Sequence, residues 1–267
     1  MQKIRLIASD LDGTLLLNGA QDLKPEDFTL IRELKARNIL FLAASGREYS
    51  NLQRLFAPVK DDILYLCQNG CLTVYHDHIL SREIMKAEDA HALISAGENA
   101  KDTEVLVSGL HTCYIRKGNP SFYHHMTDIV HNHVTPVDDL HAVSEPYSKI
   151  SLFESEGIKD LAFWKEKFSS SITVQLGGTR WIDCAPKGVN KATGFQNILE
   201  HLTIPSSDTI MFGDNENDRE ILLSAGTAIA VKTANPAILP CCSLITDTVE
   251  DALHLILQGK TAGKEIN

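Results

Sequence analysis

Long apolar runs are missing from this sequence. No segment approaches the ~18 uncharged apolar residues that a membrane-spanning helix needs. The first apolar stretch, before Asp10, holds only about half a dozen residues, which is too short for the core of a signal peptide. We therefore expect a cytoplasmic protein that has no membrane partner.

Several patterns that would indicate other kinds of site are also missing. The six cysteines form no C-x-x-C pair and show no disulfide-like regularity, which is typical of reduced thiols in a cytosolic chain. Zinc is not expected. The absence of G-x-x-x-x-G-K-[ST], G-x-G-x-x-G and G-x-S-x-G disfavours P-loop nucleotide hydrolysis and serine hydrolysis. We interpret four neighbouring histidines as solvent-facing residues of a polar helix and loop, namely His124, His125, His131 and His133.

The chain has fewer basic than acidic residues. Lys and Arg number 25 against 35 Asp and Glu, which gives a net charge of -10. An acidic surface repels phosphate backbones, so we expect neither nucleic acid nor an anionic membrane as the main partner. With 43% hydrophobic and 22% charged residues over 267 positions, the chain suits one large globular domain or two smaller ones.

The two ends of the chain share one pattern. Short apolar runs alternate with helical patterns from residue 3 to 66, and the same alternation returns from residue 185 to the end. Strand and helix alternation of this kind predicts a parallel sheet with right-handed crossovers. The expected fold class is therefore α/β, a Rossmann-like core whose single sheet is assembled from both ends.

The middle of the chain has a different pattern. After a hairpin-like stretch at residues 71–84, strands rich in β-branched and aromatic residues are separated by turns, with helical patterns at 87–100 and 157–168. We predict an inserted α+β cap domain at 85–184, between core segments at 1–84 and 185–267. Such an insert can be a lid over a site, a decoration or a dimerising domain.

Two acidic residues follow the first apolar run. In an extended strand every second side chain turns to the same side, so Asp10 and Asp12 could face one space, with Gly13 bending the backbone behind them. A hard cation such as Mg²⁺ would remove their repulsion, because carboxylate oxygens are its preferred ligands. The alternative is a strand that ends in a solvated turn.

Two further apolar runs end beside a glycine, at Ser45 and at Asp214. The ends of parallel strands share one sheet edge, where ligands bind. The alternative is helix capping: Ser45 and Glu48 match a capping box, and Asp214 with Asn217 could cap the next helix. A helix that begins there directs free amide hydrogens at the pocket, which suits a phosphate.

Positive charge is also needed at such a site. Two acids, a metal and a phosphate dianion require a further cation, and the candidates are Lys187 and Lys191. Sequence spacing does not choose between these two lysines.

Four segments in order resemble the motifs of the haloacid dehalogenase (HAD) superfamily: DLDGTLL, ASGR, VNKATG and GDNENDREIL. The placement of the insert resembles the Cof-type, class IIB branch. The resemblance implies that Asp10 is the nucleophile that attacks phosphorus, and that Asp12 is the general acid and base. Lys191 falls on the position of the family's lysine, although Ala192 follows it where the family usually has glycine.

The resemblance also implies the ligands of the metal and the phosphate. Mg²⁺ would be bound by Asp10, Asp214 and the backbone carbonyl of Asp12, with Asp218 behind these ligands. The phosphoryl group would be bound by Ser45, the amides of Leu11 and Gly46, Lys191 and Asn217.

The function expected from this resemblance is the magnesium-dependent hydrolysis of small phosphomonoesters, such as sugar phosphates, through an aspartyl-phosphate. A phosphomutase or phosphotransferase of the same superfamily is the alternative. A phospho-accepting signalling receiver is usually ~120 residues without an insert, and a metal-dependent glycosyltransferase would leave Lys191 and Asp214 without a role. The oligomeric state and the substrate stay open. Possible substrate contacts in the insert are Arg116, Lys117, Tyr123, Trp164, Arg180 and Trp181.

Overall fold

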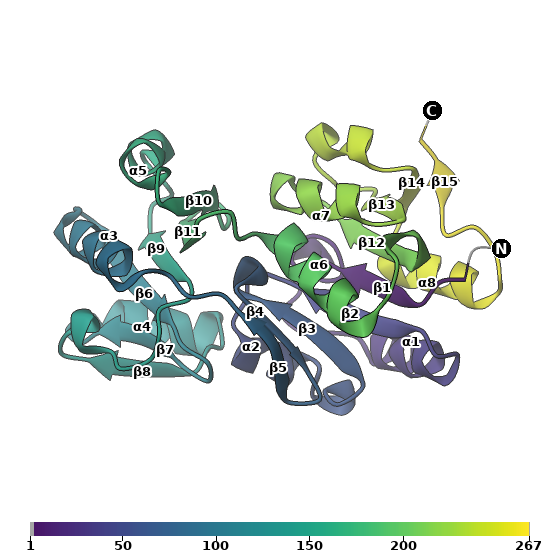
Figure 1. Cartoon of the computed structure of the whole chain (residues 1–267), viewed down its shortest axis with the longest axis horizontal. Helices are drawn as coiled ribbons and strands as arrows, with labels where there is room; N and C mark the ends of the chain where they lie inside the picture. The colour runs from purple at the N-terminus through teal and green to yellow at the C-terminus, as the bar shows by residue number, and fades with distance from the viewer. Residues whose placement is uncertain (1–2, 267) are drawn as a thin grey trace.

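The computed structural model describes residues 3–266, which form two lobes (Figure 1). Within these residues, the larger lobe contains a nine-stranded sheet in the order β15-β14-β13-β12-β1-β2-β3-β4-β5. The six strands from β14 to β3 are parallel, and antiparallel strands are added at both edges. The strands are β1 (Leu6–Ser9), β2 (Leu40–Ala44), β3 (Ile63–Cys67), β4 (Leu72–Tyr75), β5 (His78–Arg82), β12 (Thr209–Gly213), β13 (Thr227–Val231), β14 (Leu244–Thr246) and β15 (Lys264–Glu265).

Helices cover both faces of this sheet. α1 (Pro25–Ala36), α2 (Tyr49–Leu55) and α8 (Val249–Leu257) pack on one face, and α6 (Lys191–Leu202) and α7 (Arg219–Ser224) pack on the other. Because side chains alternate along a strand, Ile7 joins the first apolar cluster while Leu6 and Ala8 join the second. Burial on both faces explains the nearly continuous apolar strands, and the predicted α/β core is confirmed.

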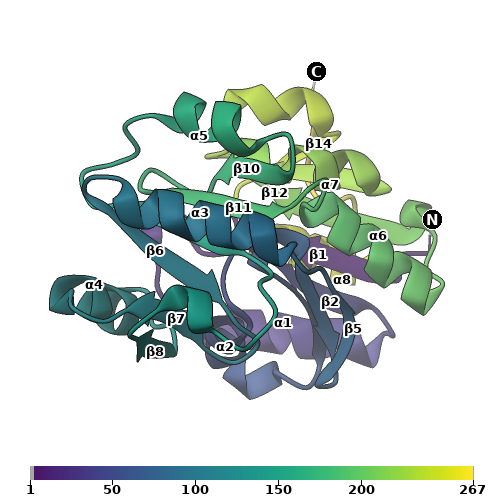
Figure 2. The ribbon, with the colours of Figure 1, turned by 60° about the vertical axis from the view of Figure 1, so that its left-hand side comes forward.

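The smaller lobe, called the cap below, contains a six-stranded sheet in the order β10-β11-β9-β6-β7-β8. α3 (Ala87–Asn99) and α5 (Leu161–Phe168) lie on one face (Figure 2), where Trp164 is part of the apolar core. α4 (Pro120–His124) continues into a π-helical turn at His125–Ile129 on the other face. The strands are β6 (Thr103–Ser108), β7 (Cys113–Arg116), β8 (Val134–Val137), β9 (Ile150–Glu154), β10 (Ile172–Leu176) and β11 (Trp181–Pro186).

The predicted insert therefore has a sheet of its own. β5 of the larger sheet ends at Arg82 and β11 of the smaller sheet ends at Pro186, close to the expected boundaries at 84/85 and 184/185, which stay a prediction. His124 and His133 are exposed as expected, whereas His125 and His131 are only partly exposed. The ring of His125 stacks on Phe153, with 4.7 Å between centroids, because the π-helical turn directs it onto the sheet.

Buried polar side chains join the two lobes. Lys149, next to β9 of the cap, donates to the Gly46 carbonyl at 2.7 Å and lies 3.2 Å from a Glu48 oxygen. Asp183 of the cap lies 3.7 Å from the same amine and accepts from Asn69 of the larger lobe at 2.7 Å. Burial favours the neutral form of Lys149, but the charges of Asp183 and Glu48 outweigh it and raise its pKa.

These contacts overturn one local interpretation. Ser45 and Glu48 form no capping box, because α2 begins only at Tyr49 and Glu48 itself is its N-cap residue. The Glu48 carboxylate instead accepts from Gln68 and Ser108, at 2.7 Å each. A buried lysine and two further donors satisfy this carboxylate better than one backbone amide would.

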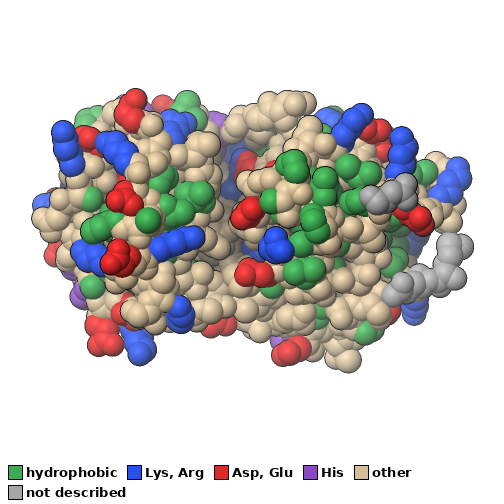
Figure 3. Space-filling model, turned by 90° about the horizontal axis from the view of Figure 1, so that it is seen from above, with side chains coloured by type: hydrophobic (Ala, Val, Ile, Leu, Met, Phe, Trp, Pro, Cys, Tyr) green, Lys and Arg blue, Asp and Glu red, His purple; other side chains and the backbone are tan. Residues whose placement is uncertain are grey.

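The exterior shows no separation of charge on the side seen in Figure 3. Acidic and basic side chains are interspersed over both lobes, and the surface is hollowed between them. No helix within residues 3–266 combines the length and the apolar character that crossing a bilayer requires.

Candidate active site

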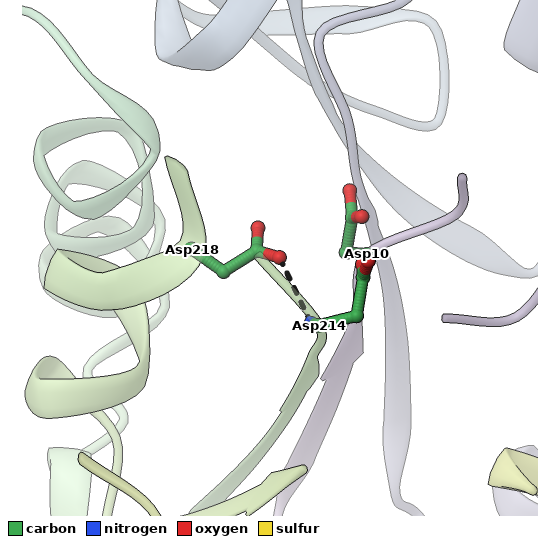
Figure 4. Close-up of side chains that lie close together, drawn as sticks. All are labelled: Asp10, Asp214 and Asp218. Carbon is green, nitrogen blue, oxygen red and sulfur yellow. Dashed lines mark hydrogen bonds between the residues drawn. The ribbon is translucent and has the colours of Figure 1, made fainter. Parts of the chain in front are cut away.

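Three aspartates meet at the edge of the larger sheet. Asp10 follows β1 and Asp214 follows β12, and these strands are adjacent and parallel. Asp218 ends the short 3₁₀ helix Glu216–Asp218 that comes after β12. One carboxylate oxygen from each residue lies within 4.8 Å of the others. Figure 4 shows the three side chains gathered at this edge. The carboxyl ends of parallel strands thus place separate parts of the chain at one point.

Asp218 is fixed by the backbone of its own turn. Its Oδ2 accepts from the amides of Asp214 at 3.2 Å and Asn215 at 3.3 Å. The N-cap residue of the 3₁₀ helix is Asn215, so the alternative that Asp214 serves as the helix cap is wrong. Asp214 is left free to face the site.

Lys191 lies between two of the acids. Its Nζ is 2.6 Å from Asp10 Oδ1 and 2.6 Å from Asp218 Oδ1, and the side chain is buried. Asn190 caps α6 by accepting from the Thr193 amide at 3.0 Å, so the first residue of the helix is fixed at the sheet edge. Lys187 instead donates to the Ser169 carbonyl of the cap. Only one of the two candidate lysines is therefore at the site.

The charges of this group do not cancel. Asp10, Asp214 and Asp218 set against Lys191 leave two negative charges when all four are ionised. Burial and the charge of Asp218 raise the pKa of Asp10 well above its ordinary range, against the opposing charge of Lys191. Asp10 and Asp218 together raise the pKa of Lys191, although burial opposes them. Carboxylate oxygens with two surplus negative charges suit a hard divalent cation such as Mg²⁺.

Two neighbouring residues hold Asp214 in place. The hydroxyl of buried Thr14 donates to Asp214 Oδ1 at 2.8 Å, and this bond lowers the pKa of Asp214 while burial, the larger effect, raises it. Gly13 has φ +92°, and a Cβ at this position would lie 2.4 Å from Asp214 Oδ2. Glycine is therefore required both for its backbone conformation and for its lack of a side chain. Thr14 was not among the site residues predicted from the sequence.

Asp12 does not share the space of Asp10. Its side chain is 58% exposed and pairs with Arg47, whose Nε lies 2.8 Å from Oδ2 and whose Nη2 lies 2.6 Å from Oδ1. The expected strand alternation fails because β1 ends at Ser9 and the chain turns between residues 11 and 14. Arg47 belongs to the ASGR segment, but spacing alone gave no sign of its partner.

The other expected phosphate ligands lie near these strand ends. Ser45 follows β2 and is buried, and its hydroxyl accepts from the Arg47 amide at 3.2 Å. The Leu11 side chain is buried in the core, so only its backbone is available to a ligand. Asn217 is half-buried, and its side-chain amide has no hydrogen-bonding partner among residues 3–266.

A family model described as haloacid dehalogenase-like hydrolase matches residues 7–253. This chain belongs to that family. Among its relatives is the 5-amino-6-(5-phospho-D-ribitylamino)uracil phosphatase YbjI of Escherichia coli (strain K12), which is 26% identical over 240 residues covering 88% of each chain. The present haloacid dehalogenase-like protein is a phosphatase, as expected from its four motifs.

Solved structures confirm the fold of this haloacid dehalogenase-like phosphatase. A crystal structure from Eubacterium rectale matches with a TM-score of 0.85 and 24% identity over 96% of this chain and 98% of that one. The HAD subclass IIB sugar phosphatase BT4131 matches with a TM-score of 0.78 and 19% identity over 95% and 99%. Both matches extend over nearly the whole chain, so the fold that they share with it includes the core and the inserted lobe.

Proposed function

We propose that this phosphatase hydrolyses small phosphomonoesters such as sugar phosphates, with Mg²⁺ as cofactor and an aspartyl-phosphate on Asp10 as intermediate. The observation that supports this most directly is the buried group of Asp10, Asp214 and Asp218 around Lys191. The group combines a nucleophilic carboxylate, further oxygen ligands and a fixed positive charge.

Different residues around the group would bind the metal and the phosphoryl group. Mg²⁺, held by Asp10, Asp214 and the Asp12 carbonyl, would offset the negative charges of the carboxylates and the phosphate. The other ligands of the phosphoryl oxygens are Ser45, Lys191, Asn217 and the amides of Leu11 and Gly46. Asp218 keeps Lys191 directed at Asp10 through its 2.6 Å contact.

The reaction has two steps on these residues. A carboxylate oxygen of Asp10 attacks phosphorus, the ester P–O bond breaks, and the departing alkoxide takes a proton from Asp12. In the second step Asp12 takes a proton from water, whose oxygen attacks phosphorus. The bond to Asp10 then breaks and releases inorganic phosphate. The Asp12 carboxylate is exposed, and to carry a proton it gives up one of its two hydrogen bonds from Arg47 while keeping the other.

Small polyol phosphates are the proposed substrates. YbjI is named for a substrate with a phosphoribityl group, and BT4131 is a sugar phosphatase, so both act on phosphorylated polyols or sugars.

Of the candidate cap contacts, Trp164 is ruled out by its place in the apolar core. Arg116 and Lys117 pair with Glu98 and Asp138. Arg180 and Trp181 both contact the Phe153 ring, which lies on the face of the cap sheet that is opposite to Trp164.

The test is a screen of phosphorylated metabolites with and without Mg²⁺, for this protein and for Asp10→Asn. We expect release of inorganic phosphate that requires Mg²⁺ and is abolished by Asp10→Asn. Asp27→Asn is the matched control, because Asp27 is also a buried aspartate but lies on α1, outside the acidic group. Activity that survives Asp10→Asn would refute the proposed nucleophile. Formation of an isomeric sugar phosphate without free phosphate would indicate a phosphomutase.

A further inference from the structure

A chain of hydrogen bonds runs from Asp12 to the cap. Asn51, a buried residue on α2, accepts from Arg47 Nη1 through its Oδ1 at 3.0 Å. Its Nδ2 donates to the carbonyl of Val130 at 2.6 Å and to that of His131 at 3.2 Å. Arg47 in turn binds both carboxylate oxygens of Asp12. One amide therefore connects the side chain of the proposed general acid to the other lobe.

The chemistry of this junction specifies an amide. A guanidinium has only donors to offer and a carbonyl oxygen only accepts, so residue 51 must present an acceptor on one side and a donor on the other. Asparagine does both with one short side chain. A carboxylate would repel the carbonyls of Val130 and His131, and an apolar side chain would leave both sides without partners.

The cap backbone has an unusual conformation where it meets Asn51. The π-helical turn at His125–Ile129 immediately precedes the two accepting carbonyls. His131 has φ +59°, a left-handed conformation that is uncommon outside glycine. Such turns and backbone strain concentrate at functional sites. We call residues 125–131 the docking turn.

Asp12 depends on this chain for its orientation. Within residues 3–266, Arg47 is the only side-chain partner of the Asp12 carboxylate. Arginine has several rotatable bonds, and fixing them carries an entropy cost. With Asn51 in place, three nitrogens of the guanidinium are engaged, so the head group has one orientation. The docking turn of the cap holds Asn51 at the far end of this chain of hydrogen bonds.

We propose that Asn51 is a positioning residue, which holds Arg47, and through it the Asp12 carboxylate, in place against the docking turn. This inference rests on the proposed function, in which Asp12 gives a proton to the departing alkoxide. A displacement of ~1 Å at a reacting group can cost about 100-fold in rate. The loss of kcat on replacing Asn51 should therefore be larger for a leaving group that needs a proton from Asp12 than for one that does not.

The test compares two esters in the full-length enzyme. Asn51→Ala is expected to lower kcat for an alkyl phosphate such as glycerol 3-phosphate by about 10- to 100-fold. For p-nitrophenyl phosphate, whose leaving group departs without a proton, we expect a fall of less than about 3-fold. KM should change little for either ester. Asn51→Asp, of nearly the same size, should show the same contrast. Gln53→Ala is the control, since Gln53 lies on α2 but bonds to Tyr49 and Asp77.

A second readout does not depend on activity. Hydrogen exchange at the docking turn should speed up in Asn51→Ala, because the carbonyls of Val130 and His131 lose their partner, while exchange in β12 should stay unchanged. Equal losses of kcat for the two esters, or no loss, would overturn the positioning role. Unchanged exchange would overturn the bridge itself. If the unaltered enzyme releases phosphate from neither ester and from no metabolite of the screen while exchange responds, the bridge stands, and the proposed function and the positioning role both fail.

Discussion

Replacing Asp27 by asparagine should make the protein more stable at neutral pH and remove part of its pH dependence. Asp27 is 3% exposed in the first turn of α1, where its Oδ2 accepts from the Lys24 amide at 2.7 Å. Its other oxygen is buried and has no hydrogen-bonding partner among residues 3–266. Burial, with the charge of nearby Glu250, raises the pKa of Asp27 from 3.8 to about 6, against the hydrogen bond from Lys24, which lowers it.

The sign and size follow from proton linkage. Because the folded protein holds this proton more tightly than the unfolded chain, the free energy of unfolding falls as the pH rises from about 4 to about 6. The difference between 3.8 and about 6 corresponds to about 3 kcal/mol, all of which is lost by pH 7. Asparagine keeps an acceptor for the Lys24 amide but does not titrate. The unfolded chain already loses part of this proton near pH 4, so the advantage of Asp27→Asn should grow by about 2 kcal/mol between pH 4.5 and pH 7.

Urea unfolding followed by circular dichroism at pH 4.5, 5.5 and 7 measures this difference, provided the m-values of the two proteins agree. Subtracting the free energy of unfolding of the variant from that of the unaltered protein cancels the contribution that the other acids make to both. Asp22→Asn is the control for replacing an aspartate by asparagine, because the Asp22 carboxylate is exposed in its pair with Arg54 and lies outside α1. A constant difference for Asp27→Asn across the three pH values would refute the reasoning.

Two further changes test other parts of the structure. Gly13→Ala should displace Asp214 and lower phosphatase activity by about 100-fold, with weaker Mg²⁺ binding by calorimetry; Gly19→Ala, at φ +73° with open space around it, should lose neither. Lys149→Met should lower the free energy of unfolding by about 3–5 kcal/mol in thermal or urea unfolding, because it leaves Glu48 and Asp183 buried without their cation. Adding Glu48→Gln should recover part of that loss, and failure to recover any would contradict the charge argument.

Periodic patterns carried most of the fold prediction. The alternation of short apolar runs with helical patterns is enforced by burial on both sheet faces, so the strands around Ile7, Leu42 and Met211 were recognisable without a structure. Strand-end residues could likewise be expected at one edge, because parallel topology requires it. The histidines of residues 124–133 were interpreted only as part of a polar helix and loop, since α4 and the π-helical turn have 5 residues each, too few to show a period.

Long-range partners were not predictable in the same way. Glu48 stands at the spacing of a capping residue from Ser45, and only the folded chain brings Lys149 close enough to compete for it. Arg47 and Asp12 are joined by a turn that breaks the strand pattern after Ser9. Thr14 was visible in the first motif, but its contact with Asp214 depends on two strands becoming neighbours. In each case the sequence contains the residue and the tertiary fold selects its partner.

The contacts between the lobes converge on one segment of the core. Lys149 binds the Gly46 carbonyl, and the docking turn binds Asn51, so residues 45–51 are held by the cap from two directions. A buried charge group adds little net stability compared with an apolar one of the same shape, but displacing one member leaves the others buried without a partner. The same segment contains Ser45, a proposed phosphate ligand, and Arg47, the partner of Asp12. The cap therefore holds the segment that contains both of these proposed residues, and we expect cap substitutions that touch no substrate to change kcat.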